Sequence, residues 1–454
     1  MLAGTAGLTD LDVAGRSGAI SIPAASSSPN GNLLEFTNLS TGSGQGHGRG
    51  HNGGGQGPWG GQGQGGHDQN GQGQGQGWQN QGGQGWNLWG NDGRFDGGRS
   101  HGGSGREQNP GQGRDHWRGG HHGGGEGASS ITPGLADISA TVPAGYQNVI
   151  VQAPGFATLT GNGANGENYL FGAKSNVDLN TEGGSGSIVA AGGADSLNLA
   201  GNYAVSAVGG SDAVTTGGGS DTISAYGTAS VSVTAASGTA TGLTFINHGT
   251  SRATVFAGAG SATIFGGDGG GSYHAGAAGA NSLVGGSGSV SLYGRASGDV
   301  LEAGVSTGGA TVHGTNMLEA GAGNETLLAT SLTGANNLVA GSGADSIASK
   351  GSGLQTFYGG SGSATMSGST MSGATNIYLL GAASAPGGND VVTNFRLGTD
   401  VLEGLNGATI TTVTASNFGG HSGALVTLSD GTRVQLTGVS ASSISGNIGK
   451  SGLI

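Results

Sequence analysis

A short glycine-rich frame recurs along the second half of this chain and limits what the chain can fold into. The segments 217–225, GGGSDTISA, and 257–265, AGAGSATIF, share glycines, then a variable position (Asp221 or Ala262), then an apolar residue two positions later. From residue 183 the glycine clusters recur about every nine residues, with short apolar or β-branched runs between them. Because glycine costs about 1 kcal/mol inside a helix, these runs predict strands joined by turns. Strands at this period predict a parallel β-solenoid with a narrow core.

Composition separates a second kind of sequence from the repeats. Residues 43–127 are rich in glycine and glutamine and hold all five tryptophans and seven of the eleven histidines. Such a segment buries too little apolar surface to offset its ordering entropy, so we expect it to be disordered. Its six arginines balance six acidic residues, and the net charge of −12 therefore lies outside it. We expect no nucleic-acid partner, because no basic surface is present, and no membrane span, because no apolar run is long enough.

Five segments follow from these patterns. We expect a weakly structured N-terminal segment at 1–42, which lacks the features of a secretory signal, and the disordered tail at 43–127. The alternating sequence ISATVPAGYQNVIVQA places β-strands that cap the solenoid within 128–182. The solenoid itself spans 183–386, and a C-terminal cap spans 387–454, with a hairpin predicted around Asp430 and Gly431.

The repeats resemble the RTX, or haemolysin-type calcium-binding, nonapeptide G-G-x-G-x-D-x-U-x, in which U is a large apolar residue. The clearest matches are the segments 217–223, GGGSDTI, and 341–347, GSGADSI, and GGNDVVTNFRLGTDVLEG at 387–404 resembles the segment that closes such rolls. The resemblance implies a right-handed parallel β-roll whose U residues fill the interior and whose turns hold Ca²⁺ between successive coils. It also implies type I export through an uncleaved C-terminal signal, and therefore a bacterial extracellular or cell-surface protein.

The variable position decides where calcium can bind. Calcium takes six to eight oxygen ligands, so two carboxylates must flank one site from adjacent coils, about eighteen residues apart. Spacing selects three groups; Asp221 matches the motif without such a partner, and Asp390 and Asp400 match the pattern of the closing segment. The candidate metal ligands are Asp195 with Asp212; Asn281, Asp299 and Asn316; Glu325 with Asp345; and Asp221 and Asp390. The alternative is that these acidic residues are only solvated turn residues, which turns favour.

No catalytic constellation stands out in the sequence. No H-E-x-x-H occurs, and the G-x-S-x-G at 98–102 lies in the low-complexity segment without the strand and helix that a nucleophile elbow needs. We therefore expect a secreted, non-enzymatic, calcium-binding protein that acts as a cell-surface adhesin or biofilm component, with extracellular polysaccharide or a cell surface as partner. One alternative is a layer or fibril that self-associates through the tail. A second is a secreted enzyme with an unrecognised site in 128–180.

Overall fold

The computed structural model describes three N-terminal strands (8–12, 18–20 and 32–37) and residues 138–453, except 153, 238–241, 306–313, 332, 382–387, 418–419 and 421. The chain divides into two units, residues 1–44 with 131–454, and residues 45–130. The expectations for the low-complexity segment, including its disorder and its G-x-S-x-G, lie outside the described residues.

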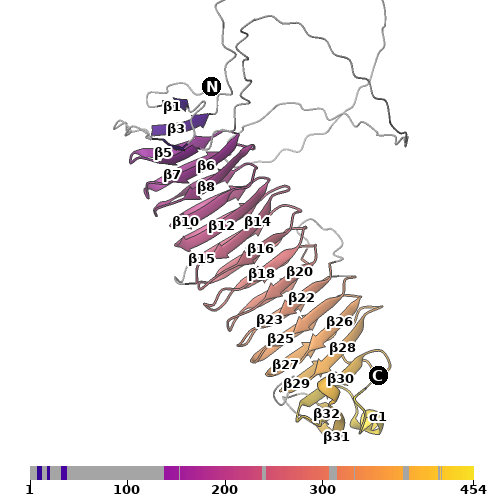
Figure 1. Cartoon of the computed structure of the whole chain (residues 1–454). Helices are drawn as coiled ribbons and strands as arrows, with labels where there is room; N and C mark the ends of the chain where they lie inside the picture. The colour runs from indigo at the N-terminus through magenta and orange to yellow at the C-terminus, as the bar shows by residue number, and fades with distance from the viewer. Residues whose placement is uncertain are drawn as a thin grey trace, which may run out of the picture. The chain divides into compact units, whose positions relative to one another are not determined.

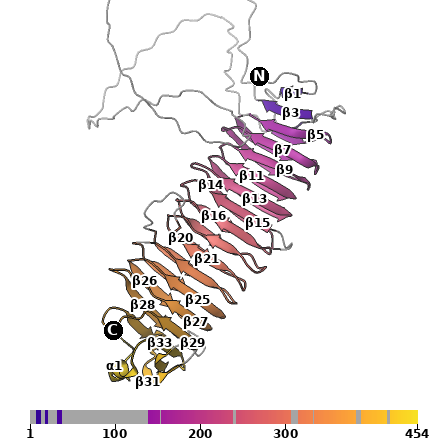
Figure 2. The same ribbon diagram turned by 180° about the vertical axis from the view of Figure 1, so that it is seen from behind.

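Parallel strands alternate between two sheets, so that every coil of the chain adds one strand to each (Figure 1). Sheet A is built from the odd-numbered strands, which are seen best from behind (Figure 2). These strands are β1 (Leu8–Asp12), β3 (Asn32–Thr37), β5 (Tyr146–Val151), β7 (Asn165–Phe171), β9 (Ser185–Ala190), β11 (Asn202–Ala207), β13 (Ser220–Ala225), β15 (Gly242–Asn247), β17 (Ala262–Phe265), β19 (Ser282–Val284), β21 (Val300–Ala303), β23 (Thr326–Ala329), β25 (Ala344–Ser349), β27 (Ser363–Ser367) and β29 (Asn389–Thr393).

Sheet B is built from the even-numbered strands, each hydrogen-bonded to the next one in the same direction. They are β2 (Gly18–Ile20), β4 (Ile138–Thr141), β6 (Gly155–Thr160), β8 (Ser175–Asn180), β10 (Ser196–Ala200), β12 (Ser211–Gly218), β14 (Ser230–Ala235), β16 (Ala253–Phe256), β18 (Gly271–His274), β20 (Val290–Tyr293), β22 (Asn316–Glu319), β24 (Asn336–Val339), β26 (Leu354–Tyr358), β28 (Thr375–Leu380) and β30 (Val401–Gly404). The predicted all-β parallel solenoid is confirmed. Strands β4 to β8 continue the same two sheets, so the stack includes the segment assigned to N-terminal capping strands.

The core is a pair of apolar columns, one from each sheet, because alternate residues of each strand face inward. The U positions of the repeat supply both columns, as the sequence predicts. In sheet A they are Ile188, Val205, Ile223, Phe245, Ile264, Leu283, Leu301, Leu327, Ile347, Met366 and Val392, and in sheet B they run from Leu197 through Val214, Val233, Val255, Tyr273, Leu292, Leu318, Leu338, Phe357 and Tyr378 to Leu402, all buried.

Glycine is required where neighbouring turns touch. Gly219 has φ +87, and a Cβ on it would collide with the carbonyl of Gly201 in the preceding coil. Gly227 also has a positive φ, +62, but a Cβ there would meet nothing within 4 Å. At some positions glycine is therefore required both by the close approach of the neighbouring coil and by the positive φ. At others it is required by the positive φ alone.

The C-terminal end closes the stack with antiparallel strands. Strands β31 (Ile410–Ser416), β32 (Gly423–Leu428) and β33 (Arg433–Thr437) pair antiparallel, and β33 continues sheet A beside β29. The predicted hairpin is confirmed, since the Asp430 carboxylate accepts the backbone N–H of Thr432 at 3.0 Å in the turn between β32 and β33. The remaining elements are η1 (Leu405–Gly407), α1 (Ala441–Ile444), η3 (Ser445–Asn447) and β34 (Gly452–Leu453), which pairs with β30.

Candidate functional site

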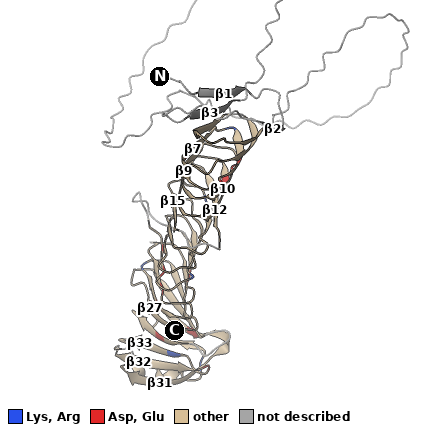
Figure 3. Ribbon diagram, turned by 90° about the vertical axis from the view of Figure 1, so that its left-hand side faces the viewer, with Lys and Arg blue, Asp and Glu red and all other residues tan. Residues whose placement is uncertain are grey.

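All nine candidate ligands point into the solenoid, where each is at most 3% exposed. They lie at or just before the start of a strand, two residues ahead of the buried U residue, and therefore face the same interior. Asp221, Asn281, Asp299, Glu325, Asp345 and Asp390 belong to sheet A, and Asp195, Asp212 and Asn316 belong to sheet B. The interpretation of these residues as solvated turn residues is wrong, because burial removes them from bulk water. Charged residues are sparse along the whole stack (Figure 3).

These side chains hydrogen-bond to the coil before their own. Asp221 Oδ1 accepts the backbone N–H of Tyr203 at 2.9 Å, and Asp390 Oδ1 accepts that of Ala364 at 2.9 Å. The same contact joins Asp195 to Val177, Asp212 to Asp195, Asn281 to Ala262, Asp299 to Asn281, Asn316 to Val290 and Asp345 to Glu325, at 2.7 to 3.3 Å. Each acceptor satisfies a buried donor at the entry to a strand. The side chain at the variable position therefore accepts a backbone hydrogen bond that joins adjacent coils.

Asp299 uses both carboxylate oxygens for this purpose. Oδ1 accepts the backbone N–H and the side-chain amide of Asn281, at 2.9 and 2.7 Å. Oδ2 accepts the backbone N–H groups of Arg295 and Ala296, at 2.8 and 2.9 Å, within its own turn. Four donors occupy a group that offers about four lone-pair sites. Asp299 therefore has no free lone pair with which to bind a metal ion in this arrangement.

Asp195 and Asp212 are neighbours in sheet B and each keeps one oxygen unpartnered. Oδ2 of each is buried and has no hydrogen-bond partner among the described residues. Burial is the main cause that raises the pKa of Asp195 to about 7, with the nearby Asp212 carboxylate adding to it. Burial likewise raises the pKa of Asp212 to about 6. The spacing argument that paired these residues is confirmed in its geometry, since Asp212 Oδ1 accepts the Asp195 N–H at 3.3 Å.

Glu325 lies between two other carboxylates in sheet A. Its backbone N–H donates to Asp345 Oδ1 at 2.9 Å, and both of its carboxylate oxygens are buried without a hydrogen bond of normal geometry. Burial, followed by interaction with Asp345 and then Asp299, raises its pKa to about 7. The predicted pairing of Glu325 with Asp345 on one side of the solenoid is confirmed.

The predicted grouping of Asn316 with Asp299 is wrong. Asn316 begins β22 of sheet B, whereas Asp299 stacks in sheet A with Asn281 before it and Glu325 after it. The coil that contains residues 306–313 is longer than eighteen residues, so a distance of seventeen residues leads to the opposite sheet. Asn316 instead joins a line of buried amides: its Nδ2 donates to Asn336 Oδ1 at 2.8 Å, and Asn336 Nδ2 donates to Gln355 Oε1 at 2.7 Å.

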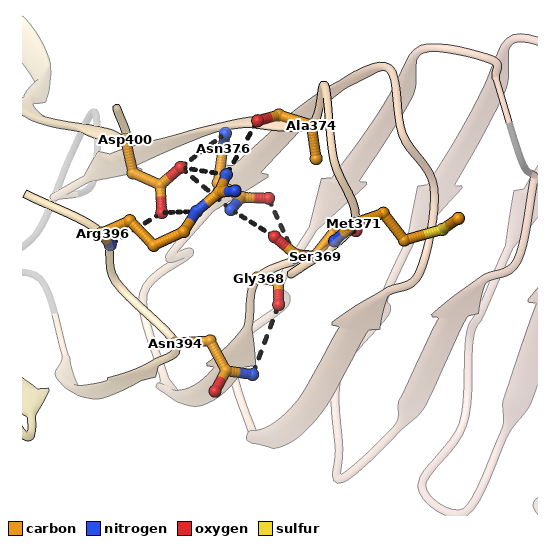
Figure 4. Close-up of polar contacts among 8 residues, drawn as sticks. All are labelled: Gly368, Ser369, Met371, Ala374, Asn376, Asn394, Arg396 and Asp400. Carbon is orange, nitrogen blue, oxygen red and sulfur yellow. Dashed lines mark hydrogen bonds and ion pairs between the residues drawn. The ribbon is translucent and has the colours of Figure 1, made fainter. Parts of the chain in front are cut away.

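Asp400, which the closing motif singles out, is held by Arg396 (Figure 4). The guanidinium Nη2 lies 2.7 Å from Oδ1, Nε donates to Oδ2 at 3.2 Å, and the Asn376 side-chain amide donates to Oδ1 at 3.1 Å. Burial works to raise the pKa of Asp400, but these hydrogen bonds outweigh it and keep the pKa below its ordinary value. Asp221 and Asp390 differ from Asp400, because no arginine among the described residues pairs with them. Burial raises the pKa of Asp221 to about 6 and that of Asp390 to about 7.

The Asp195–Asp212 pair fits calcium in part, because its free oxygens come from two adjacent coils, whereas the two free oxygens beside Asp345 both belong to Glu325. Two carboxylate oxygens there are free, yet the nearby carbonyl of Gly193 already accepts the Ser211 N–H at 2.9 Å. Within the described residues no group of three or more His, Cys, Asp or Glu side chains is arranged to hold a metal ion. Any calcium at this pair would therefore complete its six to eight ligands with water or further backbone oxygens.

Comparison with family models, with curated proteins and with solved structures finds no match to the chain. The resemblance to RTX repeats therefore depends on the motifs quoted above. Among the described residues, no helix is long and apolar enough to span a membrane.

Proposed function

We propose that this chain is a secreted, non-enzymatic scaffold that calcium stabilises at the Asp195–Asp212 pair and that acts as an adhesin or matrix component at the cell surface. The observation that carries the proposal is the pair of buried, unpartnered Oδ2 atoms on adjacent coils. A buried carboxylate that lacks a partner is costly, so it takes up either a proton or a cation. In a neutral medium that contains millimolar calcium, the cation is the available partner.

The size of the expected stabilisation follows from mass action. Extracellular calcium modules bind with dissociation constants of about 10⁻⁴ to 10⁻³ M. At a calcium concentration about ten times the dissociation constant, the gain in the free energy of unfolding is about 1.4 kcal/mol. For a domain of this size that gain corresponds to about 1–3 °C in melting temperature. Calcium therefore adjusts the stability of a fold that the apolar columns already hold together.

The scaffold part of the proposal is supported by the repetition of the outer faces. In sheet A, Thr222, Thr244 and Thr263 stack in register on three successive coils, followed by Ser282. Parallel strands lie about 4.8 Å apart, so the same hydroxyl group recurs at that interval. A surface of this kind offers one chemical group many times over, which suits weak, multivalent attachment to an extended partner.

The test is thermal melting of the full chain at pH 7.5, followed by circular dichroism, with EDTA, with calcium and with magnesium. We expect calcium alone to raise the melting temperature, and the double variant Asp195→Asn/Asp212→Asn to abolish the increase. Asp221→Asn is the matched control, because Asp221 is similarly buried but no carboxylate of a described residue lies beside it. Its neighbours in register on the adjacent coils are Tyr203 and Leu243. A calcium response that is absent, or that survives in the double variant, contradicts the calcium site.

Location and adhesion need a separate assay. Antibody labelling of intact cells of the native host, before and after a wash with EDTA, measures the protein at the surface. We expect labelled cells and attachment of the purified chain to them. Protein found only inside the cells would contradict the extracellular role, whatever the melting experiment shows.

A further inference from the structure

The outer face of sheet B carries a polar strip along its middle coils. Outward-facing residues of β14, β16, β18 and β20 place Ser232, Thr254, Ser272 and Ser291 directly beside one another in register. Side-chain hydroxyls at this spacing are both donors and acceptors. No hydrogen bond from the hydroxyls of Ser232, Thr254 or Ser291 to a described residue is present.

Arg252 lies just before β16, two residues before Thr254, and is exposed. It lines two neighbouring hollows of about 250 and 220 Å³, one over β12 to β16 and the other over β20 to β24. Strand β18 lies between the two and places Ser272 on the outer face. The other lining side chains that could donate to a ligand are Ser211, Ser230, Ser232, Thr254, Ser289, Ser291, Thr315 and Asn337.

The charge of Arg252 is not neutralised within the described structure. The ion pair between Arg396 and Asp400 is the one salt bridge among the described residues, and it belongs to the C-terminal end. Arg252 is also the single lysine or arginine between Lys174 and Arg295. Asp268, in the turn before β18, accepts the Ser287 hydroxyl. An exposed guanidinium is therefore bordered by hydroxyls, and Asp212, the one acidic residue among the described residues that line the two hollows, is buried.

Aromatic side chains border the other side of the same strip. Phe256, His274 and Tyr293 follow the hydroxyl residues by two positions and stack with ring centroids 4.3 Å apart at each step. Because Phe256 and Tyr293 cover the two faces of His274, that ring turns its edge to solvent along the strip. Aromatic edges carry partial positive charge, so they favour the oxygen atoms of a polar ligand.

We infer that this surface, the Arg252 groove, binds a segment of an acidic polysaccharide, with Arg252 holding a sugar carboxylate or sulfate and the serine and threonine hydroxyls contacting the neighbouring sugars. A guanidinium forms paired hydrogen bonds with a carboxylate, which fixes the ligand's register. The negative charge of the rest of the chain does not prevent this contact, because at physiological salt the screening length is about 8 Å. The inference builds on the proposed extracellular role and names the partner class.

Fluorescence anisotropy tests the groove with the full chain, in EDTA so that calcium cannot bridge protein and ligand. The probes are labelled hexasaccharides of hyaluronan and chondroitin sulfate, and the neutral comparison is labelled maltohexaose. We expect saturable binding of at least one acidic probe, weakened by added salt, and at least tenfold weaker binding of the neutral one. Arg252→Gln should reduce acidic-probe binding at least tenfold. Lys350→Gln is the matched control, since it removes one exposed positive charge from the turn after β25.

A second variant guards against misfolding of the first. Ser291→Glu adds a negative charge to the groove without touching Arg252, and it should also weaken binding while the melting temperature stays unchanged. The inference is overturned if neither acidic probe binds, if maltohexaose binds equally well, or if Arg252→Gln and Lys350→Gln behave alike. Glycan binding and calcium-dependent melting are separate readouts, so failure of the groove leaves the calcium site standing, and the reverse.

Discussion

The same one-atom substitution is expected to have opposite effects on stability at Asp195 and Asp299. In Asp195→Asn the amide keeps the acceptor for the Val177 N–H and replaces the unpartnered Oδ2. The pKa of about 7, against a reference of 3.8, means that ionisation at pH 8 opposes folding by up to about 4 kcal/mol at 1.36 kcal/mol per pKa unit. Water and relaxation reduce such penalties, and the buried amide N–H groups of the new side chain offset part of the gain, so we expect Asp195→Asn to stabilise the protein by about 1 kcal/mol at pH 8.

In Asp299→Asn the amide nitrogen must replace one of two oxygens that each accept two hydrogen bonds. A buried N–H that loses its acceptor costs about 1–3 kcal/mol, so the loss of two gives about 2–5 kcal/mol of destabilisation. Urea unfolding at pH 8 in EDTA measures both variants against the wild type. At pH 5 the effect of Asp195→Asn should shrink toward zero, because Asp195 then carries its own proton. Equal signs at pH 8 would refute the assignment of hydrogen-bonding roles.

The raised carboxyl pKa values, the turn glycines and the C-terminal ion pair each lead to a further prediction. In EDTA the melting temperature of the full chain should fall as pH rises from about 5 to about 7.5 and then level off, because carboxyls with raised pKa values bind protons more tightly in the folded state; a rise over that range would contradict their burial. Gly219→Ala should destabilise by several kcal/mol, whereas Gly227→Ala should cost about 1 kcal/mol, since both have positive φ but only the first meets a neighbouring carbonyl; urea midpoints that agree would contradict the stacking argument. Arg396→Gln should cost about 3–5 kcal/mol by leaving Asp400 buried without its ion-pair partner, and Lys350→Gln serves as a control for loss of one exposed positive charge; equal urea midpoints for these two variants would show that the ion pair adds no stability.

The strands and the core could be predicted from the sequence because they depend on local pattern. The apolar residue two positions after the variable position, such as Ile223 or Ile347, is buried in the coils that follow the frame. The frame recurs often enough to be recognised from the sequence. Side-chain direction at the variable position also follows from the strand period, since it lies two residues before U. The pairing of Asp195 with Asp212 could be counted directly because no insertion separates them.

The contacts of the variable position could not be predicted from the sequence. Counting in steps of about eighteen residues placed Asn316 beside Asp299, and this was wrong because an insertion lengthens one coil. The insertion leaves the frame on either side unchanged, so the sequence pattern does not reveal the shift. A match to a calcium-binding motif also does not show whether a carboxylate is free or already saturated. Asp299 accepts four donors while Asp195 leaves an oxygen unpartnered, and this difference arises from the turns around them. Gln355 occupies the variable position two residues before Phe357 but is not acidic, so the calcium motif does not select it, yet it ends a line of buried amides.

The most direct test of the central claim is the number of protons released when calcium binds. Isothermal titration calorimetry of the full chain with calcium, in two buffers of different ionisation enthalpy, gives that number at each pH. If the buried Asp195–Asp212 pair exchanges a proton for the metal ion, binding should release protons at pH 6.5 and almost none at pH 8.5. An absence of calcium binding, or a proton count that is the same at both pH values, would contradict the account.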